Sequence, residues 1–274
     1  MDQTDEDSAR AIKPEIDQVW ADPSADVVLV SSDHVAFHVP CYHILSQSTA
    51  LRDAIQIDSA HCPNSVSSQS DTPRSKPVTF NFSDEDYETA ESIRLFLSIA
   101  TSGDIDQIAA SNPSTIVRIL LSGILFLQKY DCAPALHNLT SWLRKHAATE
   151  ARNSKVLNAL DCFIIGAKTG LDSLAVDAVK NYKPRGIKVK TRGSDGQEDG
   201  GERYEMDEFA PMQEERWCWG VYTGLDPAEF PIIAWEACPQ ITIWALSKAC
   251  KQASSWHTRG ELLESILDEV RFLR

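Results

Sequence analysis

Two short apolar segments, residues 26–30 and 35–39, constrain the fold of this chain more than any other feature. The first, DVVLV, is apolar and β-branched after its Asp, which is typical of a strand covered on both faces. The second, VAFHV, alternates, so its apolar side chains share one face of a strand. Because the SSDH segment between them, residues 31–34, has turn chemistry, the pair predicts a β-hairpin.

Helices are predicted to cover this hairpin, in a cluster centred on residues 116–129. The apolar residues of this segment lie on nearly every side of a helix, which is typical of a buried, central position. A third strand is predicted at 78–82, and Ser83 with the acidic residues behind it predicts a helix N-terminus. The remaining helices are predicted at about 42–57, 84–102, 134–146, 154–168, 171–182, 239–255 and 258–273. The predicted fold class is α+β.

Composition divides the chain into segments. Residues 58–77 are rich in Ser, Pro, Asn and Asp and lack periodicity, so they predict a mobile loop. The expected organisation is an acidic N-terminal arm at 1–24, a domain at 25–148, a helical hairpin at 149–182, a linker or mobile loop at 183–215 and an aromatic-rich helical region at 216–274.

The net charge of −14 over 274 residues disfavours two classes of partner. Such an acidic chain repels phosphate backbones and anionic membranes, so no nucleic acid and no membrane is expected as a direct partner. Seven Cys, an odd number without a CxxC pair, indicate free thiols in a reducing compartment. The N-terminus lacks the features of a signal peptide, and the longest apolar stretch is far short of the roughly 20 residues that span a bilayer. We therefore expect a soluble protein of the cytoplasm or nucleus.

Signatures of catalysis and of metal binding are missing from the sequence. GxSxG, HExxH, GxGxxG and P-loop patterns do not occur. Five residues at first suggest metal ligands, but their spacing fits no zinc signature: His38, Cys41, His43, His61 and Cys62. We therefore expect no metal, no cofactor and no enzymatic activity, while an active site assembled from residues distant in sequence stays open.

Two further clusters each have two interpretations. The aromatic residues of the C-terminal region could form a ligand- or peptide-binding surface, but we favour a role in the core. They are Trp217, Trp219, Tyr222, Phe230, Trp235 and Trp244. The basic stretch from Lys183 to Arg192 could be a nuclear import signal, but a solvated linker is favoured.

Five short motifs occur in the same order as the predicted elements. They are ADVVLV at 25–30, VAFHV at 35–39, ILS at 44–46 with LRD at 51–53, SIRLFL at 92–97 with TSG at 101–103, and LQKYD at 127–131. Together they resemble the BTB/POZ family, in the branch known mainly from fungi, over roughly residues 20–146. The chain departs from the family pattern in its longer loop at 58–77, and the short strand that follows the helix at 88–102 in the family is not evident.

The resemblance implies a BTB/POZ fold at 25–148, with a small three-stranded sheet capped by a helical cluster, followed by a mostly α-helical C-terminal extension. It also implies a protein–protein interaction module that acts as an adaptor or a self-associating scaffold. Its partners would be other proteins, with a second copy of the chain in a homodimer among them. Two alternatives stay open: a monomeric substrate adaptor for a cullin-type ubiquitin ligase, which would bind a cullin, and an enzyme with an unrecognised active site.

The resemblance further points to the residues of a protein interface. Dimer contacts in the family are generally made by the first helices, here with Tyr42, and by the segment before the opening strand. Four apolar residues of that segment have the i, i+4, i+7, i+8 spacing of one helical face: Ile12, Ile16, Val19 and Trp20. Asp26 matches the Asp of the family's opening strand. Because Pro40 and Cys41 stand where many members have His-Lys, the basic partner of Asp26 is missing or comes from elsewhere.

Overall fold

The computed structural model of the protein describes residues 13–60, 77–101, 104–148, 157–182, 186–190, 202–206 and 225–272. These residues form two compact units. The first unit holds the described residues up to 101 together with 122–136, and the second holds 104–121 together with the described residues from 137 onward. The helix α5 (Ile116–Lys129) therefore has its first part in the second unit and its remainder in the first.

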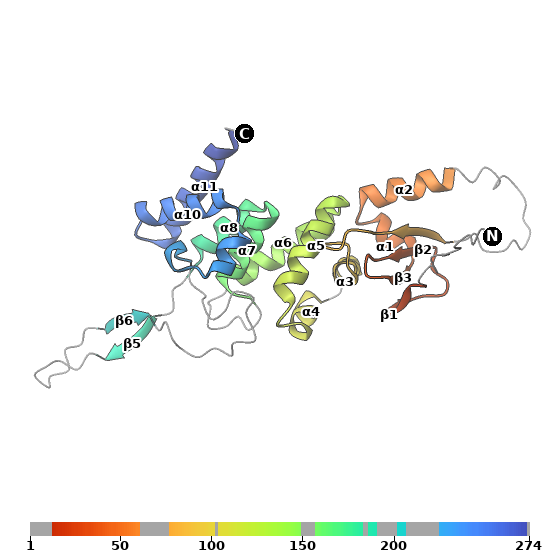
Figure 1. Ribbon diagram of the computed structural model, residues 1–274, viewed down its shortest axis with the longest axis horizontal. Helices are drawn as coiled ribbons and strands as arrows, with labels where there is room; N and C mark the ends of the chain where they lie inside the picture. Colours follow the sequence, from red (N-terminus) through yellow and green to blue (C-terminus); the bar gives the residue numbers. More distant parts are fainter. Residues whose placement is uncertain are drawn as a thin grey trace, which may run out of the picture. The chain divides into compact units, whose positions relative to one another are not determined.

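The first unit is built on a four-stranded sheet (Figure 1). Its strands are β1 (Glu15–Ala21), β2 (Val27–Val30), β3 (Val35–Val39) and β4 (Val78–Asn81), in the order β1-β3-β2-β4. β2 and β3 form an antiparallel hairpin, and β4 runs parallel to β2, which confirms the three predicted strands. The prediction of a three-stranded sheet is wrong, because β1 adds a fourth strand parallel to β3.

The helices of the first unit are α1 (Cys41–Leu45), α2 (Thr49–Ala60), α3 (Ala90–Ala100) and the later part of α5. The helix predicted at 42–57 is thus two helices. Between them, the Ser48 hydroxyl accepts the N–H of Leu51 at 3.0 Å and donates to the carbonyl of Tyr130 at 2.6 Å. The break is therefore held by a hydrogen bond to the residue that follows α5.

The core of the first unit consists of apolar side chains from the sheet, α3 and α5. Phe37 of β3, Phe96 of α3 and Phe126 of α5 are fully buried. The rings of Phe96 and Phe126 lie 5.7 Å apart, and Phe82 meets Phe126 edge-on at 5.5 Å. Burial of each of these side chains contributes about 1.5–3 kcal/mol. The buried α5 agrees with the central helix predicted at 116–129.

Glu88, a buried carboxylate in the turn between β4 and α3, organises this part of the unit. One carboxylate oxygen accepts the backbone N–H groups of Ser83 and Asp84, each at 2.7 Å. The other accepts Nζ of Lys129 and the hydroxyl of Tyr130, each at 2.5 Å. Glu88 thereby joins the turn after β4 to the C-terminal end of α5.

The helix N-terminus predicted at Ser83 is wrong. α3 begins only at Ala90, with Thr89 in the N-cap position. The local signal of Ser83 and its acidic neighbours is overridden because the Glu88 carboxylate binds the N–H groups that open the turn.

The hydrogen bonds of Glu88 make its ionisation part of the stability of the fold. Burial opposes ionisation, but the hydrogen bonds from Lys129, Tyr130 and the turn outweigh it and lower the pKa of Glu88 from 4.5 to about 2. The ionised group therefore stabilises the folded state fully above pH 4.5, and this contribution is lost as the pH falls toward 2.

We predict that Glu88→Gln lowers the free energy of unfolding at pH 7 by about 1–3 kcal/mol, because it removes charge-assisted hydrogen bonds from a buried site. Urea unfolding between pH 7 and pH 3 measures the effect, and the difference between the variant and the native protein should shrink as the pH falls. Glu85→Gln, on an exposed neighbour, is the control. A loss of equal size for both variants would contradict the role of Glu88.

The described part of the second unit is helical apart from one hairpin. Its helices are α4 (Ile105–Ser111), most of α6 (Ala133–Ala147), α7 (Ala159–Thr169), α8 (Asp172–Lys180), the 3₁₀ helix η2 (Pro227–Glu229), α9 (Ile232–Ala237), α10 (Gln240–Gln252) and α11 (Trp256–Phe272). The paired helices predicted on either side of Gly170, and the last two predicted helices, match α7, α8, α10 and α11. None of the helices in the described part of the chain is long and apolar enough to cross a bilayer.

The hairpin consists of β5 (Gly186–Lys190) and β6 (Glu202–Met206), which pair antiparallel. Both strands lie in the segment predicted to be a linker or mobile loop, so this segment contains regular secondary structure. Apolar and charged residues alternate in IKVK and in RYEM, which is the period of a strand. The rest of 183–215 and most of the predicted loop at 58–77 lie outside the described residues.

α7 and α8 pack closely because a glycine lies at their contact. A Cβ atom at Gly166 would lie 2.6 Å from the backbone nitrogen of Ala175 and 3.1 Å from its Cα. The chain then reverses at Gly170, whose φ of 70° is a left-handed conformation that glycine adopts without strain. This confirms the helical hairpin predicted around Gly170.

We predict that Gly166→Ala lowers the free energy of unfolding by about 1–3 kcal/mol, because the added methyl group must displace backbone of α8. The loss should occur although Ala is the better helix former by about 1 kcal/mol. The control is Gly123→Ala in α5, where the new methyl group meets the end of the flexible Leu95 side chain and the loss should be smaller. Thermal unfolding checks both variants, and equal stability of Gly166→Ala and the native protein would contradict the close contact.

Candidate protein-interaction surface

The apolar residues of the N-terminal arm lie on the edge strand β1 and not on a helix. The spacing of Ile16, Val19 and Trp20 fits a helical face, but residues 15–21 pair in parallel with β3. The helical prediction is wrong here because the open edge of β3 offers backbone partners, whereas a short isolated helix is marginal in water. Ile12 lies outside the described residues. Ile16, Val19 and Trp20 together are called the β1 surface below.

Strand β1 is interrupted by a bulge. Between Ile16 and Ala21 it advances five residues while β3 advances two. Within this stretch the carboxylate of Asp17 accepts the backbone N–H of Val19 at 2.9 Å and that of Trp20 at 3.1 Å. These N–H groups are bound by a side chain, so the bulge blunts the edge against pairing with a further strand.

The bulge is attached to α3 through an ion pair. Nε of Arg94 donates to the second carboxylate oxygen of Asp17 at 2.7 Å, and the Arg94 guanidinium lies 5.8 Å from the ring centroid of Phe37. Burial opposes ionisation of Asp17, but the hydrogen bonds from Arg94 and from the two backbone N–H groups outweigh it and lower its pKa. The buried Asp17 therefore links the edge strand to the core of the first unit.

The side chains beside the bulge face solvent. Val19 is 81% exposed and Ile16 is 48% exposed, while Trp20 is half-buried. Tyr42, in the first turn of α1, is 62% exposed, and its ring centroid lies 4.0 Å from that of His43. Exposed apolar side chains that lie close together are a feature of contact surfaces.

The partner of Asp26 is a backbone N–H group and not the basic side chain that the family pattern would supply. The carboxylate of Asp26 accepts the N–H of Cys41, the first residue of α1, at 2.7 Å. It thus serves as the capping acceptor that Pro40 cannot supply. Burial opposes ionisation of Asp26, but hydrogen bonds from Cys41 outweigh it and lower the pKa of Asp26. A hydrogen bond between the Cys41 side chain and Asp26, together with burial, raises the pKa of the Cys41 thiol.

The strand pairing brings three of the predicted interface residues to one end of the sheet. The start of β2, the end of β3 and the end of β1 coincide there. Asp26 precedes β2, Tyr42 follows β3 and Trp20 lies near the end of β1. Ile16 lies toward the opposite end, where β3 begins, and Val19 lies between. The predicted residues are therefore spread along the sheet edge and its end.

Sequence reasoning missed Asp17 and Arg94, which position this surface. Each residue leaves only a weak signal in the sequence. Asp17 is an acidic residue in a segment with regularly spaced apolar residues, and Arg94 is the one charged residue of SIRLFL. Their 77-residue separation hides the contact from local patterns.

In the part of the chain that the structure describes, no group of three or more His, Cys, Asp or Glu could hold a metal ion. His61 and Cys62 lie outside that part. Burial raises the pKa of Cys132 and of Cys238 to about 12, so both thiols stay protonated at neutral pH and are weak nucleophiles.

The aromatic residues of the C-terminal region divide between core and surface. Phe230 is buried, with its ring 6.2 Å from that of Phe163, as the core interpretation predicts. For Trp235 and Trp244, which are exposed, that interpretation is wrong. Trp217, Trp219 and Tyr222 lie outside the described residues.

In comparisons with known proteins, no family model matches the chain, and no curated protein or solved structure matches it either. The BTB/POZ resemblance therefore stays a prediction.

We predict that Asp17→Asn and Arg94→Gln each loosen β1, because each removes the charge-assisted hydrogen bond between the edge strand and α3. A double-mutant cycle in urea should give a coupling energy of about 1–2 kcal/mol. Hydrogen exchange of the amides of residues 15–21 should become faster in both variants. Glu15→Gln, on an exposed residue of the same strand, is the control. Additive effects of the two substitutions would contradict the link.

Proposed function

We propose that the protein is a protein–protein interaction module of BTB/POZ type, an adaptor or self-associating scaffold of the cytoplasm or nucleus. The observation that carries the proposal is the β1 surface, where apolar side chains remain exposed on a strand anchored to the core. The order of elements also supports it: a hairpin, two helices, a parallel third strand and further helices follow one another as in the resemblance.

The bulge determines what kind of contact the β1 surface can make. Asp17 binds two backbone N–H groups within the bulge, so a partner cannot pair with this stretch as a regular added strand. Contact would instead run through side chains, with Val19 and Ile16 inserted into the partner. A stable interface buries about 800 Å² on each side. These side chains would therefore form its centre, with polar residues around them.

The negative net charge of the chain opposes the association of two copies. Two copies of a chain with net charge −14 repel one another over a distance of about 8 Å at physiological ionic strength. A homodimer must therefore be held by apolar burial, and added salt should strengthen it.

The alternative is a monomeric substrate adaptor for a cullin-type ubiquitin ligase. The same bulge favours it, because a blunted edge and a strongly acidic surface both act against a second identical copy. In this alternative the exposed side chains of the first unit contact the cullin or the substrate.

We predict that the full chain has about twice its 30.4 kDa mass in solution and that Val19→Asp returns it to the monomer mass. Val19 is exposed, so the substitution places a charge on the contact without disturbing the core. Ile57→Asp, at an exposed residue of α2, is the control and should remain dimeric. Light scattering after size exclusion measures all three masses. A monomer for the native chain would reject self-association and leave the monomeric adaptor.

The monomeric alternative has its own test. If the native chain is a monomer, isothermal titration with a purified cullin should show binding that Val19→Asp or Tyr42→Ala weakens. Unchanged binding in both variants would reject the first unit's exposed side chains as the contact.

A further inference from the structure

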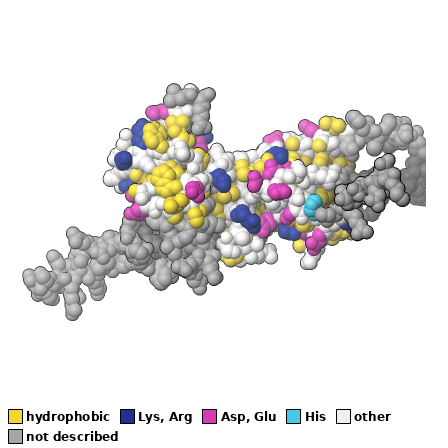
Figure 2. Space-filling model, viewed as in Figure 1, with side chains coloured by type: hydrophobic (Ala, Val, Ile, Leu, Met, Phe, Trp, Pro, Cys, Tyr) yellow, Lys and Arg dark blue, Asp and Glu magenta, His cyan; other side chains and the backbone are white. Residues whose placement is uncertain are grey.

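A second exposed apolar surface lies in the C-terminal part of the second unit. Figure 2 shows hydrophobic side chains gathered on the surface of this unit. On α10, Ile241, Trp244, Lys248 and Lys251 follow one another at i, i+3, i+7 and i+10, which places them on one side of the helix. The opposite side of α10, with Ile243 and Leu246 among its residues, is buried. The four outward residues are called the α10 face.

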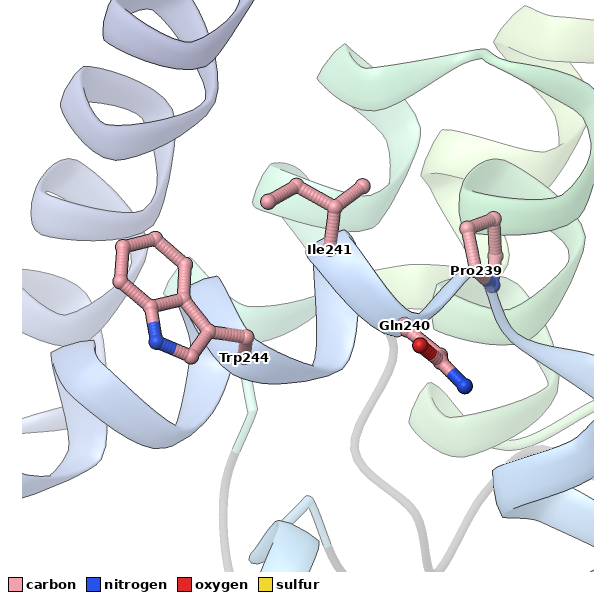
Figure 3. A pocket seen from close by; sticks show the side chains of 4 residues that line it. All are labelled: Pro239, Gln240, Ile241 and Trp244. Atoms are coloured by element: carbon pink, nitrogen blue, oxygen red, sulfur yellow. The ribbon is translucent and has the colours of Figure 1, made fainter.

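The N-terminal end of this face is hollowed. Pro239, Gln240, Ile241 and Trp244 line a shallow hollow of about 450 Å³, largely open to solvent, at the start of α10 (Figure 3). Trp244 is 50% exposed, although the large apolar side chain of Trp normally contributes to a core. This hollow is largely open to solvent, whereas ligand pockets bury most of their ligand. The hollow is instead suited to one bulky apolar side chain of a larger partner.

The charge of α10 distinguishes this face from the rest of the molecule. Lys248 and Lys251 are the charged residues of Gln240–Gln252, and no acidic residue occurs in that helix. Nζ of Lys248 lies 5.1 Å from the ring centroid of Trp244, a cation–π contact. Among the described residues neither ammonium group belongs to an ion pair. Two cations without an ion pair among the described residues, beside an exposed Trp, make this face locally complementary to an acidic segment, although the chain as a whole is acidic.

We propose that the α10 face binds a short acidic peptide segment of another protein. A bulky apolar residue of that segment occupies the hollow beside Trp244, and its carboxylates pair with Lys248 and Lys251. This site lies in the second unit, and it does not depend on the function proposed for the β1 surface.

Helix geometry gives the spacing of the segment. Trp244 and Lys251 are separated by about 10 Å along the axis of α10, since a helix rises about 1.5 Å per residue. An extended peptide covers this distance in about three residues, at about 3.3 Å each. Lys248 lies about 6 Å from Trp244 on the same measure, which an extended peptide covers in about two residues. The acidic residues should therefore stand two and three positions after the apolar residue.

The experiment uses the full chain and a fluorescein-labelled synthetic peptide with one Trp and with Glu two and three positions after it. Fluorescence anisotropy should show saturable binding that weakens as salt is raised. Three related peptides, with the Glu residues replaced by Gln, with the Glu residues replaced by Lys, or with the Trp replaced by Ala, should each bind at least about 10-fold more weakly.

Variants of the protein test whether the peptide contacts the α10 face. Trp244→Ala and the double variant Lys248→Glu/Lys251→Glu should each reduce affinity for the acidic peptide by at least about 10-fold. Phe272→Ala and Lys168→Glu, an exposed apolar residue of α11 and an exposed Lys of α7, are the matched controls and should bind as the native chain does. Circular dichroism establishes that every variant is folded.

Three outcomes would overturn the proposal. Equal binding of the acidic, neutral and basic peptides would show that charge does not contribute to the affinity. Native affinity of Trp244→Ala would show that the hollow does not contribute to it. If no peptide binds and Trp244→Ala halves the mass in solution, a second copy occupies the face.

Discussion

The carboxylate of Glu88 meets four donors that come from different parts of the first unit: two backbone N–H groups of the turn after β4, Lys129 and Tyr130. The carbonyl of the same residue accepts the N–H and the hydroxyl of Ser32, which belongs to the turn of the hairpin. Through the Tyr130 carbonyl, which accepts the Ser48 hydroxyl, the network continues to the start of α2. Sheet, turn and helices are thereby fixed relative to one another within this unit.

Sequence patterns were sufficient where burial alone determined the structure. The hairpin of β2 and β3, the buried α5 and the helix pair around Gly170 could be predicted because their periodicity has one simple interpretation. The patterns failed where a partner distant in sequence decided the outcome. Ser83 has the features of a helix start, yet Glu88 binds its N–H group, and the apolar spacing of residues 16–20 fits both a helix and a bulged strand.

The sequence pointed to the apolar residues of the β1 surface but not to the polar contacts that position it. Val19 and Tyr42 are exposed, as interface residues must be before they meet a partner. The partner of Asp26 could not be found by searching for a basic residue, because it is the N–H group of Cys41. The two exposed Trp residues of the C-terminal region illustrate the same limit, since composition does not distinguish a core aromatic residue from one at a surface.

The division of α5 between the two units has a consequence for modularity. Residues 104–121 of the second unit are inserted between two stretches of the first, so neither unit is a continuous length of chain. No single cut separates them, and the stretch around 121–122 belongs to one uninterrupted helix. A gene fusion that transplanted the first unit alone would have to carry part of the second with it. A transfer of the first unit would need both of its stretches and the helix that runs from one unit into the other.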